Sequence, residues 1–367
     1  MKNRKTVLAF LLSMLLLTES VFAAGQDPRQ MLQETVSAVS RQDIGEALTA
    51  GNSVSDWYML ALGRAGLADN AGDYLNELRE YVETSYREKG GLDRIKATEW
   101  HRTALTVQAL GGDPTAFGEK PDGTPIDLIA DGTYAWCREK ELGTQGTNAW
   151  IFALITLDAG PWEAPEDARY QKEDILRQIL DYQLEDGGFN LTKGGEADAD
   201  LTAMALQAMA PYREKCGEQI ERALNCLSCL QQPDGGFLSW GSANAESAAQ
   251  VIIALTALGI DPVQDERFIK NGADAVEALL AYRTPDGAFS HDSSMTDDLM
   301  ATEQAMLALE ALARLRGGAN RLYDMRDAAV LPEKNGGSPA LVAAAAVLAA
   351  VTAGIILYRK RRNRNHE

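Results

Sequence analysis

Positively charged and metal-binding side chains are scarce in this chain of 367 residues. Lysine and arginine number 35 against 53 aspartates and glutamates, the net charge is -18, and there are 3 histidines. Because nucleic-acid binding needs clustered lysines and arginines, this composition excludes a nucleic-acid partner. Cys226 and Cys229 have the spacing of half a zinc site, but no second cysteine or histidine pair follows at a suitable distance. We expect no metal ion and no cofactor.

Cysteine is scarce as well, and strand-like sequence is missing. An exported protein could pair four cysteines in three ways, and the sequence does not choose among them. Cys226 and Cys229 are also typical of small, buried apolar side chains. No segment alternates convincingly between apolar and polar residues, so we expect no β-sheet. The cysteines concerned are Cys137, Cys216, Cys226 and Cys229.

The first residues have the pattern of a secretory signal peptide. Basic residues at 2, 4 and 5 precede an apolar stretch from Val7 to Leu17, and Val21 and Ala23 fit a cleavage site for small residues. We predict a signal peptide over residues 1–23. The alternative is an uncleaved anchor, which the short apolar run disfavours.

The last residues have the pattern of a membrane tether. The run from Ala340 to Leu357 is uncharged and near the minimum length of a spanning helix, and a basic cluster follows it. We predict a linker over 317–338, a transmembrane helix over 339–358 and a basic cytoplasmic tail over 359–367, with the rest of the chain outside the cell. The segment LPEKN from Leu331 resembles a sortase sorting signal except at its fourth and fifth residues, so wall attachment stays an alternative.

Six Ala-rich apolar segments recur about fifty residues apart, which is a period typical of stacked supersecondary units. In each segment, apolar residues occupy nearly all faces of the predicted helix, so we expect helices that pack against other helices on both sides. The segments are DWYMLALGRAG from Asp56, TEWHRTALTVQALGG from Thr98, TNAWIFALITLDAG from Thr147, ADLTAMALQAMAP from Ala199, ESAAQVIIALTALG from Glu246 and ATEQAMLALEALA from Ala301.

A more polar, amphipathic helix is predicted before each apolar one. An amphipathic helix buries one face and exposes the other, so we expect an all-α double ring of six helical hairpins over residues 28–316, with the apolar helices inside. The amphipathic helices are expected at Arg29–Arg41, Ala71–Arg87, Asp127–Lys140, Gln171–Leu184, Glu218–Gln231 and Arg267–Tyr282.

The loops after these helices repeat as well. EDGGF from Glu185, PDGGF from Pro233 and PDGAF from Pro285 end helices, since Asp-Gly favours a turn with positive φ. With the glutamines before them, as in YQLEDGGF and CLQQPDGGF, they resemble prenyltransferase and squalene-oxidase repeats. The resemblance covers about Arg29 to Arg316 and implies an α6/α6 toroid. That superfamily includes terpene cyclases, protein prenyltransferase β subunits, cobalamin carriers and thioester domains.

Polar residues share one register near the start of five of the six inner helices, and tryptophans lie close to three of them. The toroid implied by the resemblance places inner helices around a cavity, so these residues are candidates for ligand binding. The alternative is helix capping, because Asp and Asn favour first turns. The candidates are Asp56, Trp57, Trp100, His101, Asn148, Trp150, Asp200, Glu246 and Glu303.

Three short segments bear on catalysis. DADLTA resembles the DxDDTA motif of class II terpene cyclases, which implies Asp200 as a general acid and Asp198 as its neighbour, although Leu201 replaces the last acid. The fifth and sixth inner helices lack the Cys and His that protein prenyl transfer implies. CGEQ from Cys216 resembles the core of a thioester motif that would join Cys216 to Gln219, but Lys215 replaces its leading Gly.

We therefore expect a secreted, membrane-anchored toroid that binds a small molecule, a glycan or a protein, without catalysis. A cyclase or isomerase that uses Asp200, and a thioester adhesin that uses Cys216 and Gln219, are the alternatives. Resemblance to cobalamin carriers makes a corrinoid one candidate ligand, although those carriers clamp it with a second domain.

Overall fold

A computed structural model of the chain describes residues 27–41, 48–328 and 330. The predicted signal peptide, the predicted transmembrane helix, the basic tail and the LPEKN segment all lie outside these residues. Among the helices in the described part, none has the length and apolar character that membrane crossing requires.

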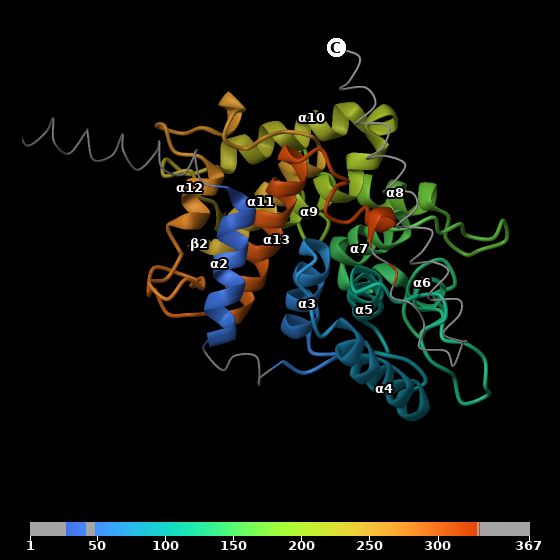
Figure 1. Cartoon of the computed structure of the whole chain (residues 1–367). Coiled ribbons are helices and arrows are strands. Elements are labelled where there is room, and N and C mark those ends of the chain that lie inside the picture. Colours follow the sequence, from blue (N-terminus) through green and yellow to red (C-terminus); the bar gives the residue numbers. More distant parts are fainter. Residues whose placement is uncertain (1–26, 42–47, 329, 331–367) are drawn as a thin grey trace, which may run out of the picture. The chain divides into compact units, whose positions relative to one another are not determined.

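Six inner helices form a closed ring (Figure 1). Each contacts the next in chain order, and the last contacts the first, so the predicted all-α toroid is confirmed. The ring consists of α3 (Ser53–Ala65), α5 (Thr98–Ala109), α7 (Thr147–Asp158), α9 (Ala199–Met209), α11 (Ala245–Ala257) and α13 (Leu299–Arg316).

Six outer helices surround this ring. Two are much shorter than predicted: α6 ends at Gly132, where a Cβ atom would lie 2.5 Å from Cβ of Trp100, and α12 starts only after its N-cap Asp274. The outer helices are α2 (Pro28–Arg41), α4 (Ala71–Lys89), α6 (Leu128–Gly132), α8 (Lys172–Leu180), α10 (Arg213–Leu230) and α12 (Ala275–Leu280).

Four outer helices pack mainly on the inner helix that precedes them in the chain, and α2, which precedes all the inner helices, packs on the last of them. Helices α6, α8, α10 and α12 contact α5, α7, α9 and α11, and α2 contacts α13. This corrects the predicted pairing, and connection length explains it: short connections favour antiparallel neighbours. The segment η3 (Ala210–Tyr212) joins α9 to α10 directly, whereas a long loop separates α8 from α9.

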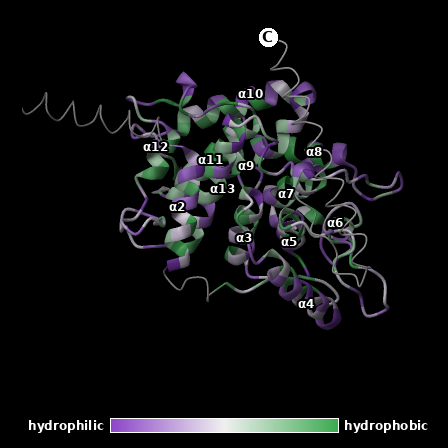
Figure 2. Cartoon of the chain, in the orientation of Figure 1, coloured by the Kyte–Doolittle hydropathy of each residue, from purple (hydrophilic) through white to green (hydrophobic). Residues whose placement is uncertain are grey.

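The Asp-Gly loops fit the structural role expected for them. Gly187 has φ +93°, and a Cβ atom there would lie 2.5 Å from the carbonyl oxygen of Arg222 on α10. The loop after one outer helix therefore touches the next outer helix. A fully buried phenylalanine, Phe189, follows and fills the space beneath the loop. Apolar residues concentrate on inner helices such as α9, and hydrophilic residues mark α4 (Figure 2).

One short hairpin departs from the all-helical prediction. Strands β1 (Leu238–Ser239) and β2 (Ser242–Ala243) pair antiparallel just before α11. Strands of two residues leave no alternation that a sequence pattern can reveal.

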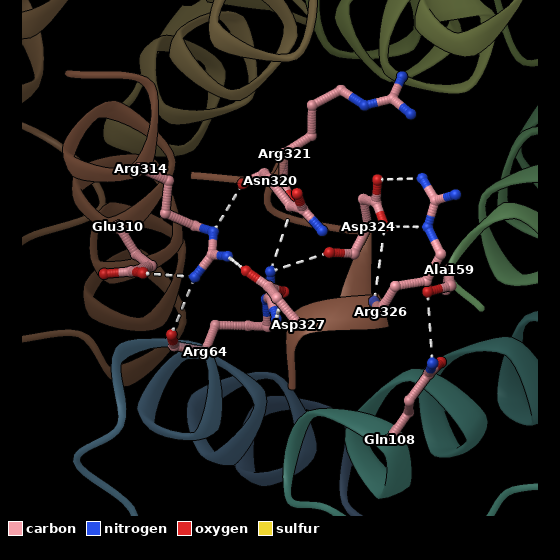
Figure 3. A network of polar contacts seen from close by, with 10 residues as sticks. All are labelled: Arg64, Gln108, Ala159, Glu310, Arg314, Asn320, Arg321, Asp324, Arg326 and Asp327. Carbon is pink, nitrogen blue, oxygen red and sulfur yellow. Dashed lines mark hydrogen bonds and ion pairs between the residues drawn. The ribbon is translucent and has the colours of Figure 1, made fainter. Parts of the chain in front are cut away.

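The segment after α13 closes the C-terminal end of the ring, so the start of the predicted linker is packed structure (Figure 3). Leu322 and Met325 are buried, and Met325 N–H donates to the carbonyl oxygen of Ala159 at 2.8 Å. The Asp327 carboxylate joins two buried arginines: Arg64, at 2.9 Å, and Arg314. We call residues 318–328 the closing segment.

Candidate functional site

A cavity of about 600 Å³ occupies the middle of the ring. Its walls come mainly from the first two turns of the inner helices, so the cavity opens at their N-terminal ends. Tyr323 of the closing segment contributes from the opposite end. The lining residues are Ser53, Trp57, Thr98, Glu99, Arg102, Asn148, Phe152, Asp200, Met204, Ser239, Trp240, Ser242, Asn244, Glu246, Gln250, His291, Met300, Gln304, Leu307 and Tyr323.

Three aromatic rings form one apolar part of this lining. The ring centroid of Trp57 lies 5.7 Å from that of Phe152 and 6.3 Å from that of Tyr323. These distances are within the range of favourable aromatic packing. The cluster offers an apolar and π-rich surface to a bound molecule.

An acidic group faces the cavity at the start of α9. Asp198 is the N-cap of the helix: it accepts from Leu201 N–H at 3.0 Å and from the Ser239 hydroxyl at 2.9 Å. Asp200 lies in the first turn and lines the cavity. Its Oδ1 atom is buried and has no hydrogen-bond partner among the described residues.

The surroundings of Asp200 favour its protonated form. The pKa of Asp200 is raised to about 6, mainly by burial and also by the Asp198 and Glu246 carboxylates, against the lowering effect of the Ser247 and Ser239 hydroxyls. A carboxyl group with this pKa is half protonated at about pH 6 and can release its proton to a bound molecule.

Two ion-paired groups border the cavity. Arg102 binds Asp56 at 2.9 Å and Glu99 at 2.8 Å, and it also donates to the Gly51 carbonyl. On the other side, Nδ1 of His291 lies 2.9 Å from a Glu246 carboxylate oxygen, which raises the pKa of His291. In the described lining, Arg102 and His291 are therefore each already paired with a carboxylate.

Four of the predicted ligand-binding residues lie together on this cavity: Trp57, Asn148, Asp200 and Glu246. They come from four different inner helices, as the ring requires. Asn148 Oδ1, like Asp200 Oδ1, is buried without a hydrogen-bond partner among the described residues. A ligand that donates hydrogen bonds could satisfy both atoms.

Three of the predicted residues lie in the core instead of on the cavity. Asp56 is fully buried, where it accepts from Tyr74 and pairs with Arg102. The indole N–H of Trp100 donates to the Tyr86 hydroxyl. His101 is fully buried beside the Gly132 carbonyl, and burial lowers its pKa to about 4, so the ring is neutral at physiological pH.

The last two predicted residues also lie outside the cavity lining. Trp150 packs edge-on against Tyr170, 5.5 Å between centroids. Glu303 is buried one residue before the lining residue Gln304, and burial raises its pKa well above the usual value. A shared register fixes the height of a residue in the ring, but the 100° rotation per residue decides whether its side chain points inward.

Several cavity residues were not predicted, although their spacing along the inner helices could have indicated them. Phe152, Met204 and Gln250 each lie four residues after a correctly placed candidate, so they share its helix face. The same spacing relates Met300 to Gln304. Arg102, Trp240 and Tyr323 carried no comparable signal, since loops and the closing segment bring two of them to the cavity.

The cysteines give the thioester prediction no structural support. All four cysteines are free thiols. Cys216 is buried, and its Sγ donates to the Tyr212 carbonyl at 3.2 Å. Burial also raises the pKa of this thiol. In the described part of the chain, no three His, Cys, Asp or Glu side chains gather into a possible metal site.

Comparison with known proteins connects this geometry to one family. A family model described as the prenyltransferase alpha-alpha toroid domain matches residues 70–271 and 141–325. Drimenyl diphosphate synthase of Streptomyces showdoensis is 23% identical over 249 residues, which cover 66% of this chain and 46% of that enzyme. The geranylgeranyl transferase type-2 subunit beta of Saccharomyces cerevisiae is 30% identical over 172 residues, or 44% and 51% of the two chains. The chain thus matches about half the length of each relative.

Solved structures show the same architecture. Protein geranylgeranyltransferase-I of Candida albicans, in complex with GGPP, has a TM-score of 0.52 and 11% identity, over 82% of this chain and 99% of that one. A variant of the type II terpene cyclase MstE from Scytonema has a TM-score of 0.51 and 14% identity, over 79% and 98%. At such identities the likeness shows the fold alone.

Proposed function

Because this chain belongs to the prenyltransferase alpha-alpha toroid family, we propose that its ring cavity binds a neutral, terpene-like small molecule and that Asp200 protonates it. The observation that carries this proposal is the position of Asp200, whose carboxyl group lines the cavity and has a pKa raised to about 6. Sequence similarity to a drimenyl diphosphate synthase supports it.

The reaction is an acid-initiated isomerisation or cyclisation. The Asp200 proton goes to one carbon of a C=C bond, whose π electrons form the new C–H bond and leave a carbocation on the other carbon. Attack by a second C=C bond closes a ring, and loss of a neighbouring proton restores a double bond. A proton returned to the Asp200 carboxylate, directly or through water, completes the cycle, so the net change needs no co-reactant.

The aromatic cluster has a part in this chemistry. Trp57, Phe152 and Tyr323 all line the cavity, and their rings pack against one another. The π faces of such rings attract cations without acting as nucleophiles. They would stabilise the carbocation and keep water away from it.

A neutral substrate follows from the charges around the cavity. The carboxyl groups of Glu99, Asp200 and Glu246 line it, while Arg102 and His291 are each held by a carboxylate. A diphosphate group needs several free lysines or arginines. We therefore propose an alcohol or hydrocarbon as substrate instead of a diphosphate, in contrast to the diphosphate in the name of the Streptomyces relative.

The test is turnover by the full-length chain. Geranylgeraniol is incubated with the wild type, Asp200→Asn and Asp200→Glu, and the products are separated by gas chromatography with mass detection. We expect cyclised or isomerised product from the wild type, a rate that falls as the pH rises above about 6, and a loss of at least ~100-fold in Asp200→Asn. Asp181→Asn, at an exposed position, is the matched control. Equal turnover in Asp200→Asn and the wild type would contradict the role of Asp200.

Binding without chemistry is the second candidate function, and Leu201 favours it. In the motif that DADLTA resembles, an acid stands where this chain has Leu201. A receptor of this kind gives no product, yet its melting temperature rises with ligand concentration by mass action. Thermal shift with geranylgeraniol and geranylgeranyl diphosphate measures binding in both cases, and the product assay then distinguishes the two candidates, because only the enzyme consumes the alcohol.

We also propose that the chain is exported and tethered to the membrane through residues 339–358. The apolar run and the basic cluster after it support this proposal. The full-length chain should then sediment with membranes of its host, and protease added to intact cells should remove residues 28–316. Deletion of 339–367 should release the protein to the medium.

A further inference from the structure

The β1–β2 hairpin lies at the mouth of the cavity. Its two-residue turn consists of Trp240 and Gly241, and Ser239, Trp240 and Ser242 all line the cavity. The hairpin therefore belongs to the same cavity as Asp200, although it lies outside the inner helices.

Trp240 is both strained and exposed. Its φ is +52° and that of Gly241 is +80°, so both turn residues have left-handed conformations, as a type I′ turn requires. Asn, Asp and Gly are the residues that such a turn favours, and a bulky side chain there is an outlier. The Trp240 side chain is also 81% exposed, and among the described residues it joins no aromatic pair.

Neither local conformation nor packing accounts for this tryptophan. A strained residue that also leaves a large apolar surface in water lowers the stability of the fold in two ways. Both costs decrease when a bound apolar molecule covers the indole. Strain and exposure at the same residue, on the rim of a cavity, therefore indicate contact with the ligand of that cavity.

The hairpin is also joined to the acidic pair. The residue before Trp240, Ser239, is buried and donates its hydroxyl to Oδ2 of Asp198 at 2.9 Å. Asn244, after β2, donates to the Ser242 carbonyl and accepts from Ser247 at the start of α11. Movement of the turn is thus transmitted to Asp198 through one hydrogen bond, beside Asp200.

We propose that the β1–β2 hairpin is a ligand-contacting flap in which Trp240 covers the bound isoprenoid and Ser239 positions the Asp198–Asp200 pair. This inference rests on the proposed function and deepens it. Trp240 selects ligands with an extended apolar body, and Ser239 is a positioning residue because it acts through the two aspartates.

Ligand binding tests Trp240. The affinity of the full-length chain for geranylgeraniol is measured by equilibrium dialysis for the wild type, Trp240→Ala and Trp240→Phe. We expect at least tenfold weaker binding for Trp240→Ala and nearly full affinity for Trp240→Phe, and the ligand should reduce acrylamide quenching of tryptophan fluorescence more in the wild type than in Trp240→Phe. Ile95→Ala, which removes another exposed apolar side chain outside the cavity lining, should bind as the wild type does.

Two outcomes of this experiment have different meanings. If the wild type binds geranylgeraniol and Trp240→Ala binds it equally well, the proposed ligand contact of Trp240 is wrong, and the proposed function of the cavity is unaffected. If the wild type binds neither geranylgeraniol nor its diphosphate, the proposed ligand class is wrong. Measurements without ligand then test the roles proposed for Ser239 and Trp240.

Those measurements follow Asp200 and the turn itself. A carboxyl ¹³C NMR titration should give a higher pKa for Asp200 in Ser239→Ala than in the wild type, because the hydroxyl near the carboxylates is lost. Ser242→Ala, in the same hairpin, should leave this pKa where it is. Trp240→Asn should raise the melting temperature by about 2 °C by relieving the strained φ. Equal pKa values in both serine variants, or a lower melting temperature in Trp240→Asn, would overturn the inference.

Discussion

At the scale of a single residue, burial of Asp200 links its proton to the stability of the fold. Its pKa is raised from 3.8 to about 6 in the folded chain. Between these two pH values the folded state holds a proton that the unfolded state has released. The stabilisation is therefore fully present below about pH 4 and is lost as the pH rises through about 6.

We expect Asp200→Asn to lack this pH dependence of stability, because the amide does not titrate. The neutral amide avoids burying a charge, so between pH 4 and pH 7 the wild type should lose about 2 kcal/mol of unfolding free energy relative to the variant. Urea unfolding at several pH values measures the difference. Parallel pH profiles of the two proteins would contradict the raised pKa, and Asp181→Asn should run parallel to the wild type.

Arg102 gives a second prediction at this scale. It is almost completely buried between Asp56 and Glu99, and Asp56 has no exposed side-chain surface. Arg102→Met leaves the Asp56 charge without its partner, which should cost about 3–5 kcal/mol in urea unfolding. Arg177→Met, which breaks an exposed pair with Asp174, should change the unfolding free energy by less than about 1 kcal/mol.

At the scale of the element, the closing segment is held by a few polar contacts. Asp327 joins Arg64 and Arg314, whose side chains are 2% and 7% exposed, and Glu310 also contacts Arg314 at 3.2 Å. The carboxylate thus balances two buried cations from the first and the last inner helix of the chain, α3 and α13, which are neighbours in the closed ring. The segment also supplies Tyr323 to the cavity.

Loss of this carboxylate should loosen the closing segment before the rest of the ring. For Asp327→Ala we expect about 2 kcal/mol lower stability, together with faster amide hydrogen exchange over residues 318–328. Arg326→Met, which removes an exposed partner of Asp324, is the matched control and should exchange as the wild type does. Unchanged exchange over 318–328 in Asp327→Ala would show that apolar packing alone holds the segment.

At the scale of the whole ring, contact between α13 and α3 removes both ends of the repeat array. In an open array each repeat has only its neighbours, so terminal repeats can unfold first. A closed ring has no terminal repeat. The described domain should therefore unfold as one cooperative unit, although it is larger than most two-state domains.

The tryptophans make this expectation measurable. Of the 6 tryptophans, 5 lie between Trp57 and Trp162, and the last is Trp240. Fluorescence mainly reports on the first half of the ring, whereas circular dichroism reports on all its helices. The two unfolding curves in urea should coincide. A fluorescence midpoint distinct from the dichroism midpoint would mean that the halves unfold separately and that closure does not couple them.

Much of this architecture could be predicted because local sequence patterns specify the individual helices. Each inner helix was found from its Ala-rich composition, and α4 was predicted at Ala71–Arg87 and observed at Ala71–Lys89. The short α6 and α12 were overestimated, because the backbone leaves helical geometry at Thr133 after α6 and α12 begins only after its N-cap Asp274. Of the candidate site, Trp57, Asn148, Asp200 and Glu246 reached the cavity, while Asp56, Trp100, His101, Trp150 and Glu303 did not.

The sequence by itself determined the number of helical repeats, the toroid class and the acidic start of α9, since periodicity and composition act over neighbouring residues. Only the tertiary structure decided which outer helix covers which inner helix, which face of each inner helix meets the cavity, and that Trp240 and Tyr323 join it from outside the inner helices. These features depend on helix rotation and on contacts between residues far apart in the chain, such as Arg64 with Asp327. No local sequence pattern specifies such contacts, because these residues meet and stabilise the fold only after the ring has closed.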